Sequence, residues 1–218
     1  MVEKEYILRF LKDLRDNNSK EWMDENRERY ELMKDRWLYE IQLVLDKLAA
    51  YNDGFARIKA KDTIHRINNN RMFQPDKPVY KDSLSCSPAG TKTKNVSTFF
   101  IMIGLDDSFI GGGLYRPDKE ILEKVRSAID YNGEEMKKII EDKKFKSFFG
   151  GLDEDDQKLK TSPQNYDKNH KFIDLINRKN FTAVKHITQD EFCSDSFVDL
   201  VEEAYINYQY LDKYLIKS

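Results

Sequence analysis

The chain has 218 residues, of which 39% are hydrophobic, 35% charged and 12% aromatic. This length allows one good-sized domain or two small ones, and the aromatic content excludes a wholly disordered chain, because disordered segments lack large apolar side chains. The formal net charge of −2 excludes a global attraction for nucleic acid or acidic membranes, although it allows a local basic patch.

Redox and targeting features predict a soluble cytoplasmic protein. Cys86 and Cys193 are far apart and form no C-x-x-C pair, which predicts two reduced thiols. No apolar run approaches the ~20 residues that a membrane span needs. The first residues, Met1 to Glu5, do not resemble a signal peptide. We therefore expect no membrane partner.

The N-terminal quarter predicts a helical arm over about residues 3–50. Residues 3–16 carry four apolar side chains at one-face spacing, namely Ile7, Phe10, Leu11 and Leu14. Asn17 and Asn18 end this helix, and Ser19 is placed to cap a long second helix that runs to about Ala50.

The following residues predict a mostly antiparallel sheet. Residues 55–67 carry short, roughly alternating apolar positions. The β-rich run 97–103 is the clearest strand and is predicted to be buried on both faces. Asp106 and Asp107 turn the chain into a second strand over 108–110, which gives a hairpin. A last strand is predicted over 181–187.

The remaining residues predict helices joined by surface connections. A helix begins near Pro117, and Gly133 separates it from a short helix that ends near Asp142. Residues 145–167 are predicted to be surface connections, and 168–178 a helix. A final helix follows a cap at Ser194 or Asp195. The simplest account is one α+β domain over 1–218, with a sheet-containing body from about 55 to 218 and helices covering one face of a central sheet.

Segment 64–81 is the strongest candidate for a functional site. Between residues 63 and 81, four cationic side chains accompany one acid, Asp76. Arg66 offers a planar fork for phosphate or carboxylate, while Lys77 and Lys81 add point charges. The candidate ligand-binding residues are Arg66, Asn69, Asn70, Arg71, Asp76, Lys77, Tyr80 and Lys81. In the structural alternative, Arg66 pairs with Asp76 or another carboxylate, and the asparagines satisfy backbone groups of a turn.

A second candidate is the glycine triplet Gly111, Gly112 and Gly113, with Arg116 beside it. Glycines before a helix can bring backbone N–H groups close to an anion. The spacing matches neither a dinucleotide fingerprint nor a P-loop. The alternative is that the glycines close the second strand and permit a bulge or a positive φ.

Metal and cofactor chemistry has no supporting motif. His65, His170 and His186 are isolated in the sequence, so we predict neither a metal nor a cofactor. His170 is open to two interpretations, a general base or a capping residue. No residue is assigned a catalytic role, and enzymatic activity and oligomeric state are left open.

Four blocks of residues resemble the bacterial family catalogued as domain of unknown function 2461. The blocks are Phe10–Tyr30 with F-L-x-x-L, N-N, W, N and Y; segment 66–81; Gly111–Arg126; and Leu159–Phe181. In the second block the family shows R-x-x-R-D-x-R-F-x-x-D-K-x-P-Y-K. This chain departs from it with Asn69, Asn70, Met72 and a proline displaced to Pro78. Because Asn70 cannot ionise, it cannot act as a general base. The resemblance implies no activity.

These observations favour a protein that binds an anionic or phosphorylated small molecule. The alternative is a protein-interaction or scaffold module without a small-molecule site. A weaker alternative is association with nucleic acid, which the near-neutral charge disfavours.

Overall fold

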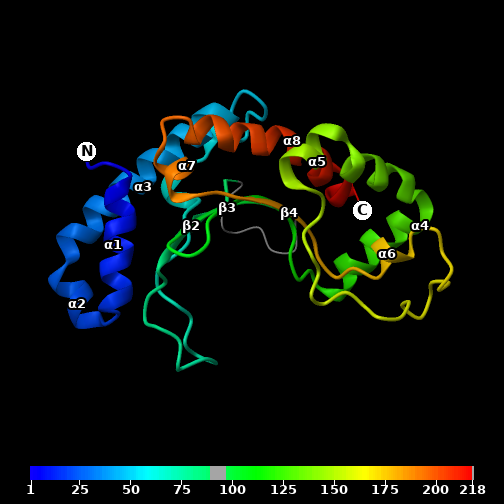
Figure 1. Cartoon of the computed structure of the whole chain (residues 1–218), viewed down its shortest axis with the longest axis horizontal. Helices are drawn as coiled ribbons and strands as arrows, with labels where there is room; N and C mark the ends of the chain where they lie inside the picture. The colour runs from blue at the N-terminus through cyan, green and yellow to red at the C-terminus, as the bar shows by residue number, and fades with distance from the viewer. Residues whose placement is uncertain (89–96, 218) are drawn as a thin grey trace. The chain divides into compact units, whose positions relative to one another are not determined.

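The computed structural model describes residues 1–88 and 97–217, and Figure 1 shows their helices and strands. Contacts group the chain into two compact units. Unit 1 comprises Met1–Lys92, Phe100–Ile110 and His186–Glu202, and unit 2 comprises Thr93–Phe99, Gly111–Lys185 and Glu203–Ser218. The single-domain organisation stays a prediction, and we describe each unit by itself. Among the described residues, no helix is both long enough and apolar enough to cross a membrane.

The predicted helical N-terminal region is present in unit 1 as α1 (Glu5–Asp16), α2 (Lys20–Glu25) and α3 (Arg27–Leu48). All four predicted apolar residues of α1 are buried. Ser19 caps α2 by accepting a hydrogen bond from the N–H of Trp22 at 3.1 Å. The prediction of one long helix is wrong at Asn26, where φ and ψ are −105° and 22°. The side chain of Asn26 bonds the carbonyl of Trp22 at 2.9 Å, which stabilises the break.

The sheet has the strand order β1-β2-β3-β4 and is antiparallel, so the predicted α+β class is confirmed. The strands are β1 (Ser83–Cys86), β2 (Thr98–Gly104), β3 (Phe109–Leu114) and β4 (Phe181–His186). β1, which the sequence patterns did not predict, pairs with β2 so that Ser83 faces Gly104 and Cys86 faces Ile101. β2 and β4 lie where they were predicted.

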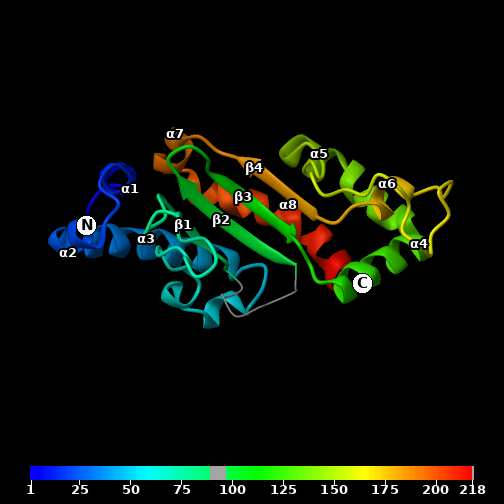
Figure 2. The same cartoon turned by 90° about the horizontal axis from the view of Figure 1, so that it is seen from below.

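The two faces of β2 differ, which corrects the expectation of a strand buried on both. Phe99, Ile101 and Ile103 are buried, while the alternating residues Thr98, Phe100 and Met102 are only partly buried. In unit 1, α3 lies on one side of the strands, and Figure 2 views them from the opposite side. In unit 2, Phe99 contacts the rings of Tyr205 and Tyr208 on α8 (Phe197–Lys217).

The glycine triplet lies inside β3 and does not close the second strand. A Cβ on Gly111 would lie 2.2 Å from the carbonyl oxygen of Ala183, and one on Gly113 would lie 2.0 Å from that of Phe181. Both glycines also have positive φ, +157° and +135°. β3 therefore approaches its neighbour β4 more closely than any residue with a side chain allows.

The helices of unit 2 follow the predicted pattern only in part. α4 (Lys119–Glu141) is kinked at Asn132, beside Gly133. α5 (Lys143–Phe149) occupies the start of the segment predicted to be a surface connection, and the helix predicted over 168–178 is reduced to α6 (Ile173–Ile176). The glycine beside the kink has a packing reason, because a Cβ added to Gly133 would lie 2.4 Å from the ring of Phe172.

Two further expectations for unit 1 are corrected, and one short helix was not predicted. Residues expected to alternate after Phe55 begin with two 3₁₀ helices, η1 (Phe55–Arg57) and η2 (Ala60–Asp62). A short helix, α7 (Gln189–Cys193), precedes the last one and is held by a capping box between Thr188 and Glu191. Ser194 ends α7, so α8 begins later than predicted, at Phe197.

A polar network lies inside unit 2. The hydroxyl groups of Ser97 and Tyr208 are 2.5 Å apart, and Tyr208 donates to Oδ1 of Asp212 at 3.0 Å. Burial raises the pKa of Asp212 above its ordinary value, although hydrogen bonds from Ser97 and Tyr208 oppose this effect. Burial also raises the pKa of Tyr208 well above its ordinary value. The network therefore contains a carboxyl group whose neutral form the fold favours.

We expect Asp212→Asn to gain stability relative to the wild type as the pH rises from about 4 to about 7.5. A carboxyl group with a raised folded-state pKa contributes stability that is fully present below its unfolded pKa and is lost as the pH rises through the folded pKa. Asparagine has nearly the same shape and does not ionise, so it removes this loss. Urea unfolding at the two pH values measures the difference, and an equal difference at both would contradict the prediction.

Candidate anion-binding site

Segment 64–81 lies within a hairpin of unit 1, residues 63–87, which we call the basic hairpin. Isolated bridges join Ile64 to Cys86 and Asn68 to Tyr80. Between them, the N–H of Lys81 donates to the carbonyl of Ile67 at 2.8 Å. The second half of the hairpin contains β1, so the segment is anchored to the edge of the sheet.

The tip of the hairpin is held by three of the predicted site residues. Nδ2 of Asn69 donates to the carbonyl of Pro78 at 3.0 Å, and Oδ1 of Asn70 accepts from the N–H of Met72 at 3.1 Å. Nε of Arg71 donates to the carbonyl of Pro75 at 3.0 Å. These contacts support the structural alternative for Asn69, Asn70 and Arg71, because each satisfies a backbone group of the turn.

Tyr80 serves to anchor the hairpin. Its backbone N–H donates to Oδ1 of Asn18 at 2.9 Å, and its carbonyl accepts from Nδ2 of Asn18 at 3.0 Å. Tyr80 is only 7% exposed, and its hydroxyl lies close enough to Tyr30 to contribute to the raised pKa of Tyr30, of which burial is the main cause. Its side chain is therefore directed toward the helical region.

An ion pair also fixes the base of the hairpin. Nε of Arg15 on α1 lies 2.6 Å from Oδ2 of Asp82, and the same guanidinium lies 2.7 Å from Oδ2 of Asp106. The acidic residue that follows Lys81 in the sequence is therefore already engaged by a cation from another element.

The remaining cations form a cluster, which we call the basic cluster: Arg66, Lys77 and Lys81. Burial lowers the pKa of the half-buried Lys81, and the positive charges of Arg66 and Lys77 lower it further. The Nζ atom of Lys81 donates to the carbonyl of Arg66 at 2.6 Å. Among the described residues, no carboxylate forms an ion pair with the basic cluster; Asp76 is exposed and forms none with Arg66.

His65 extends the basic cluster toward the sheet, although its isolated position in the sequence did not indicate a ligand contact. Its Nε2 atom lies 3.0 Å from Oγ of Ser87. Burial lowers the pKa of His65, and the charge of Lys81 lowers it further. Near neutral pH its imidazole is therefore uncharged, with one nitrogen able to donate and the other to accept.

A row of rings continues from His65 across the sheet face of unit 1. The ring of His65 lies 5.4 Å from that of Phe100, and Phe100 lies 5.9 Å from Phe109 with an interplanar angle of 25°. Phe109 in turn lies 6.2 Å from His186, whose Nδ1 atom is 2.7 Å from Oδ1 of Asp107. The alternation within β2 was the one sequence signal that could have placed Phe100 on this face.

The glycine triplet and Arg116 belong to unit 2, so we treat them separately from the basic hairpin. The glycines are buried within β3. Arg116 has a positive φ of 48°, and its N–H donates to Oδ1 of Asn180 at 2.7 Å. Close strand packing therefore accounts for the triplet, and neither the triplet nor Arg116 is part of the proposed binding site.

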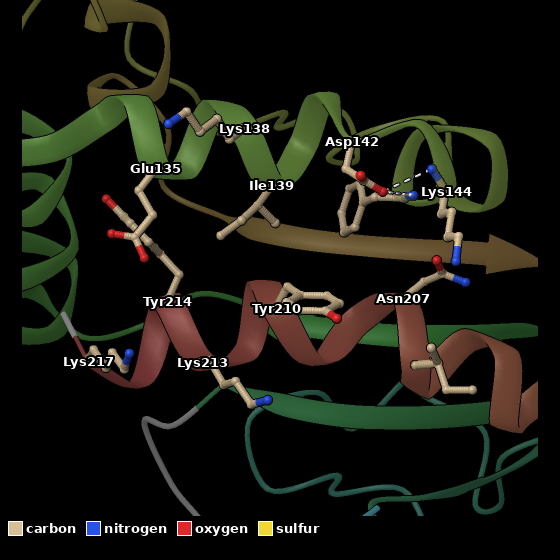
Figure 3. A pocket seen from close by; sticks show the side chains of 12 residues that line it. Glu135, Lys138, Ile139, Asp142, Lys144, Asn207, Tyr210, Lys213, Tyr214 and Lys217 are labelled. Atoms are coloured by element: carbon tan, nitrogen blue, oxygen red, sulfur yellow. Dashed lines mark hydrogen bonds between the residues drawn. The ribbon is translucent and has the colours of Figure 1, made fainter.

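Unit 2 also carries a groove of about 570 Å³ between α4, α5 and α8, shown in Figure 3. Ile139, Phe145 and Tyr210 contribute apolar surface, while Glu135 and Asp142 offset part of the charge of four lining lysines. Asp142 accepts hydrogen bonds from the N–H groups of Lys144 and Phe145, so it acts as the cap of α5. The four lysines of the groove are exposed to solvent, and none of them is half-buried as Lys81 of the basic hairpin is.

Within residues 1–88 and 97–217, no group of three or more His, Cys, Asp or Glu side chains could hold a metal ion. His170 has a local structural role, because its Nδ1 atom accepts from the N–H of Phe172 at 3.1 Å and its Nε2 atom lies 3.3 Å from Oδ1 of Asp130. These contacts favour the capping interpretation of His170.

Comparison with known proteins identifies the family. No curated protein and no solved structure matches the chain. A family model described as a conserved hypothetical protein, DUF2461, matches residues 6–214. This range includes all four blocks on which the resemblance was based. The chain therefore belongs to the DUF2461 family.

Proposed function

We propose that the basic hairpin binds an anionic or phosphorylated small molecule through Arg66, Lys77 and Lys81. The observation that carries this proposal is the half-buried Lys81, which donates to the carbonyl of Arg66 at 2.6 Å and, among the described residues, forms no ion pair with a carboxylate. Burial and the charges of Arg66 and Lys77 lower its pKa, in agreement with this arrangement. A partly desolvated lysine beside two like charges raises the free energy of the unliganded protein. A bound anion would supply the missing countercharge and relieve that cost. Clusters of this kind are concentrated at functional sites.

Each member of the basic cluster has a distinct part in the proposal. Arg66 is exposed and can form a bidentate pair with a phosphate or carboxylate. Lys77 and Lys81 add point charges, and the hydrogen bond from Lys81 to the carbonyl of Arg66 holds those two residues together. His65, uncharged near neutral pH, offers a further hydrogen bond. The proposal assigns binding and no reaction.

We expect Arg66→Ala to weaken binding of inorganic phosphate or ribose 5-phosphate by about tenfold or more, because a charge-assisted hydrogen bond contributes on the order of 1.5–3 kcal/mol. Isothermal titration calorimetry measures the affinities, and thermal shift screening first identifies anions that stabilise the wild type. Arg71→Ala is the matched control, because it removes the same charge from the same hairpin but from a side chain bonded to Pro75.

Two results would overturn the proposal. One is the absence of stabilisation by any phosphate or carboxylate. The other is an equal loss in the Arg66 and Arg71 variants, which would indicate general electrostatic attraction. The melting temperatures of the unliganded variants distinguish the binding site from the structural alternative. If the basic cluster is a binding site, Arg66→Ala leaves the melting temperature unchanged or raises it, whereas a structural ion pair would make it fall.

A further inference from the structure

The partly exposed sheet face of unit 1 carries aromatic residues at the positions that alternate with its buried side. Phe100 and Phe109 lie partly exposed on this face, whereas Phe99, Ile101 and Ile110 are buried. Polar residues are the usual choice on the solvated face of an antiparallel sheet. Two neighbouring phenylalanines there indicate a surface suited to a flat apolar ligand group.

The rings form a row, which we call the platform, in which the two phenylalanines are nearly parallel and the two histidine rings are tilted to them by 40° and 65°. Phe100 and Phe109 are close to parallel, with an angle of 25° between them and 5.9 Å between their centroids. His65 and His186 extend the row at its two ends, at 5.4 Å and 6.2 Å from the nearest phenylalanine. Because every nucleobase has a flat π face, such a surface suits base stacking and is tolerant of base identity.

The platform adjoins the basic cluster through His65. Lys81 is near enough to His65 for its charge to lower the pKa of the imidazole, and the same imidazole contacts Phe100. Positive charge therefore lies at one end of the row and aromatic surface follows it. A ligand that uses both must join an anionic group to a planar aromatic group.

We propose that the ligand of the basic hairpin is a free nucleoside phosphate, with its phosphate at Arg66, Lys77 and Lys81 and its base stacked on Phe100 and Phe109. This inference rests on the proposed function and deepens it. The other end of the row argues against a longer strand of nucleic acid. Asp107 lies in the turn between β2 and β3 and contacts His186. A second phosphate beyond the base would approach this carboxylate, which would repel it.

The test compares adenosine monophosphate, ribose 5-phosphate and a single-stranded oligoadenylate by titration calorimetry. We expect the wild type to bind adenosine monophosphate about tenfold or more tightly than ribose 5-phosphate, because stacking adds to the phosphate contacts. Phe100→Leu keeps the apolar volume but removes the ring, so it should reduce this preference to about threefold or less. Met102→Leu, a non-aromatic substitution on the same face, is the matched control and should keep the preference.

The outcomes separate this inference from the function on which it rests. Equal affinity for the two small phosphates would overturn the nucleoside assignment and leave anion binding in place. No binding of either would overturn both. Tighter binding of the oligonucleotide than of the mononucleotide, beyond its greater number of bases, would overturn the assignment in favour of nucleic acid. If Phe100→Leu does not fold, Phe109→Leu provides the same comparison.

Discussion

Gly113→Ala should lower the melting temperature by roughly 10 °C or more, which corresponds to a loss of about 4 kcal/mol in the free energy of unfolding. The new Cβ would lie 2.0 Å from the carbonyl oxygen of Phe181 and 2.8 Å from Cα of Thr182. Both are backbone atoms of β4, so no side-chain rotation can relieve the contact. The strands would have to separate, which would disturb the pairing of β3 and β4. Thermal unfolding followed by circular dichroism measures the effect.

Gly150→Ala separates the steric contact from the cost of the backbone conformation. Gly150 also has a positive φ, +80°, but an added Cβ there meets no atom within 4 Å. Its substitution should therefore cost only about 1 kcal/mol, the usual price of a left-handed conformation for alanine. If the two variants lose the same stability, the close approach of β3 to β4 is not the reason for the glycine.

Hydrophobic periodicity predicted the helices and strands that bury one regularly spaced face. Ile7, Phe10, Leu11 and Leu14 recur at helical spacing, and all four are buried in α1. The β-branched and aromatic runs of β2 and β4 likewise identified both strands. These patterns are reliable because one buried face imposes a regular spacing on the residues that form it. The α+β class followed from the order of such segments.

Elements held by single contacts were missed. The break after α2 depends on the side chain of Asn26, and α7 depends on the capping box of Thr188 and Glu191. β1 is only four residues long and is stabilised by pairing with β2, a partner that its own sequence does not reveal. The sequence explained the glycine triplet by the conformational freedom of glycine. In the structure, glycines are required because the backbone of a neighbouring strand lies too close for a side chain.

Amino-acid composition located the candidate site but did not predict which residues of the site contact one another. An excess of cations identified the basic hairpin, and within it the Nζ atom of Lys81 donates to the carbonyl of Arg66 at 2.6 Å. The direction of Tyr80 depends on its contacts with Asn18, which is 62 residues away in the sequence. Phe100 and Phe109 come into contact with His65 or with each other only through strand pairing. Relations of this kind depend on register, which single-sequence patterns do not determine.

Arg126→Ala should reduce the free energy of unfolding by about 3 kcal/mol and the melting temperature by roughly 6–12 °C. Arg126 on α4 is 6% exposed, and its Nε atom donates to the carbonyl of Ile176 at 2.9 Å. Its Nη1 atom also lies 2.8 Å from Oε1 of Glu123. Truncation would leave the Ile176 carbonyl without its donor and create a cavity beside α6, and both changes are costly in a packed interior.

Two further substitutions on α4 define what Arg126 contributes. Lys124→Ala removes the same charge from an exposed pair with Glu120, so it should change stability by no more than about 0.5 kcal/mol. Arg126→Lys keeps the charge but lacks the guanidinium that contacts both the carbonyl of Ile176 and the carboxylate of Glu123. The stability of this variant should therefore fall between those of the wild type and Arg126→Ala. Chemical denaturation of the three variants orders them. If Arg126→Lys is as stable as the wild type, charge alone explains the residue, and the geometry of its hydrogen bonds does not.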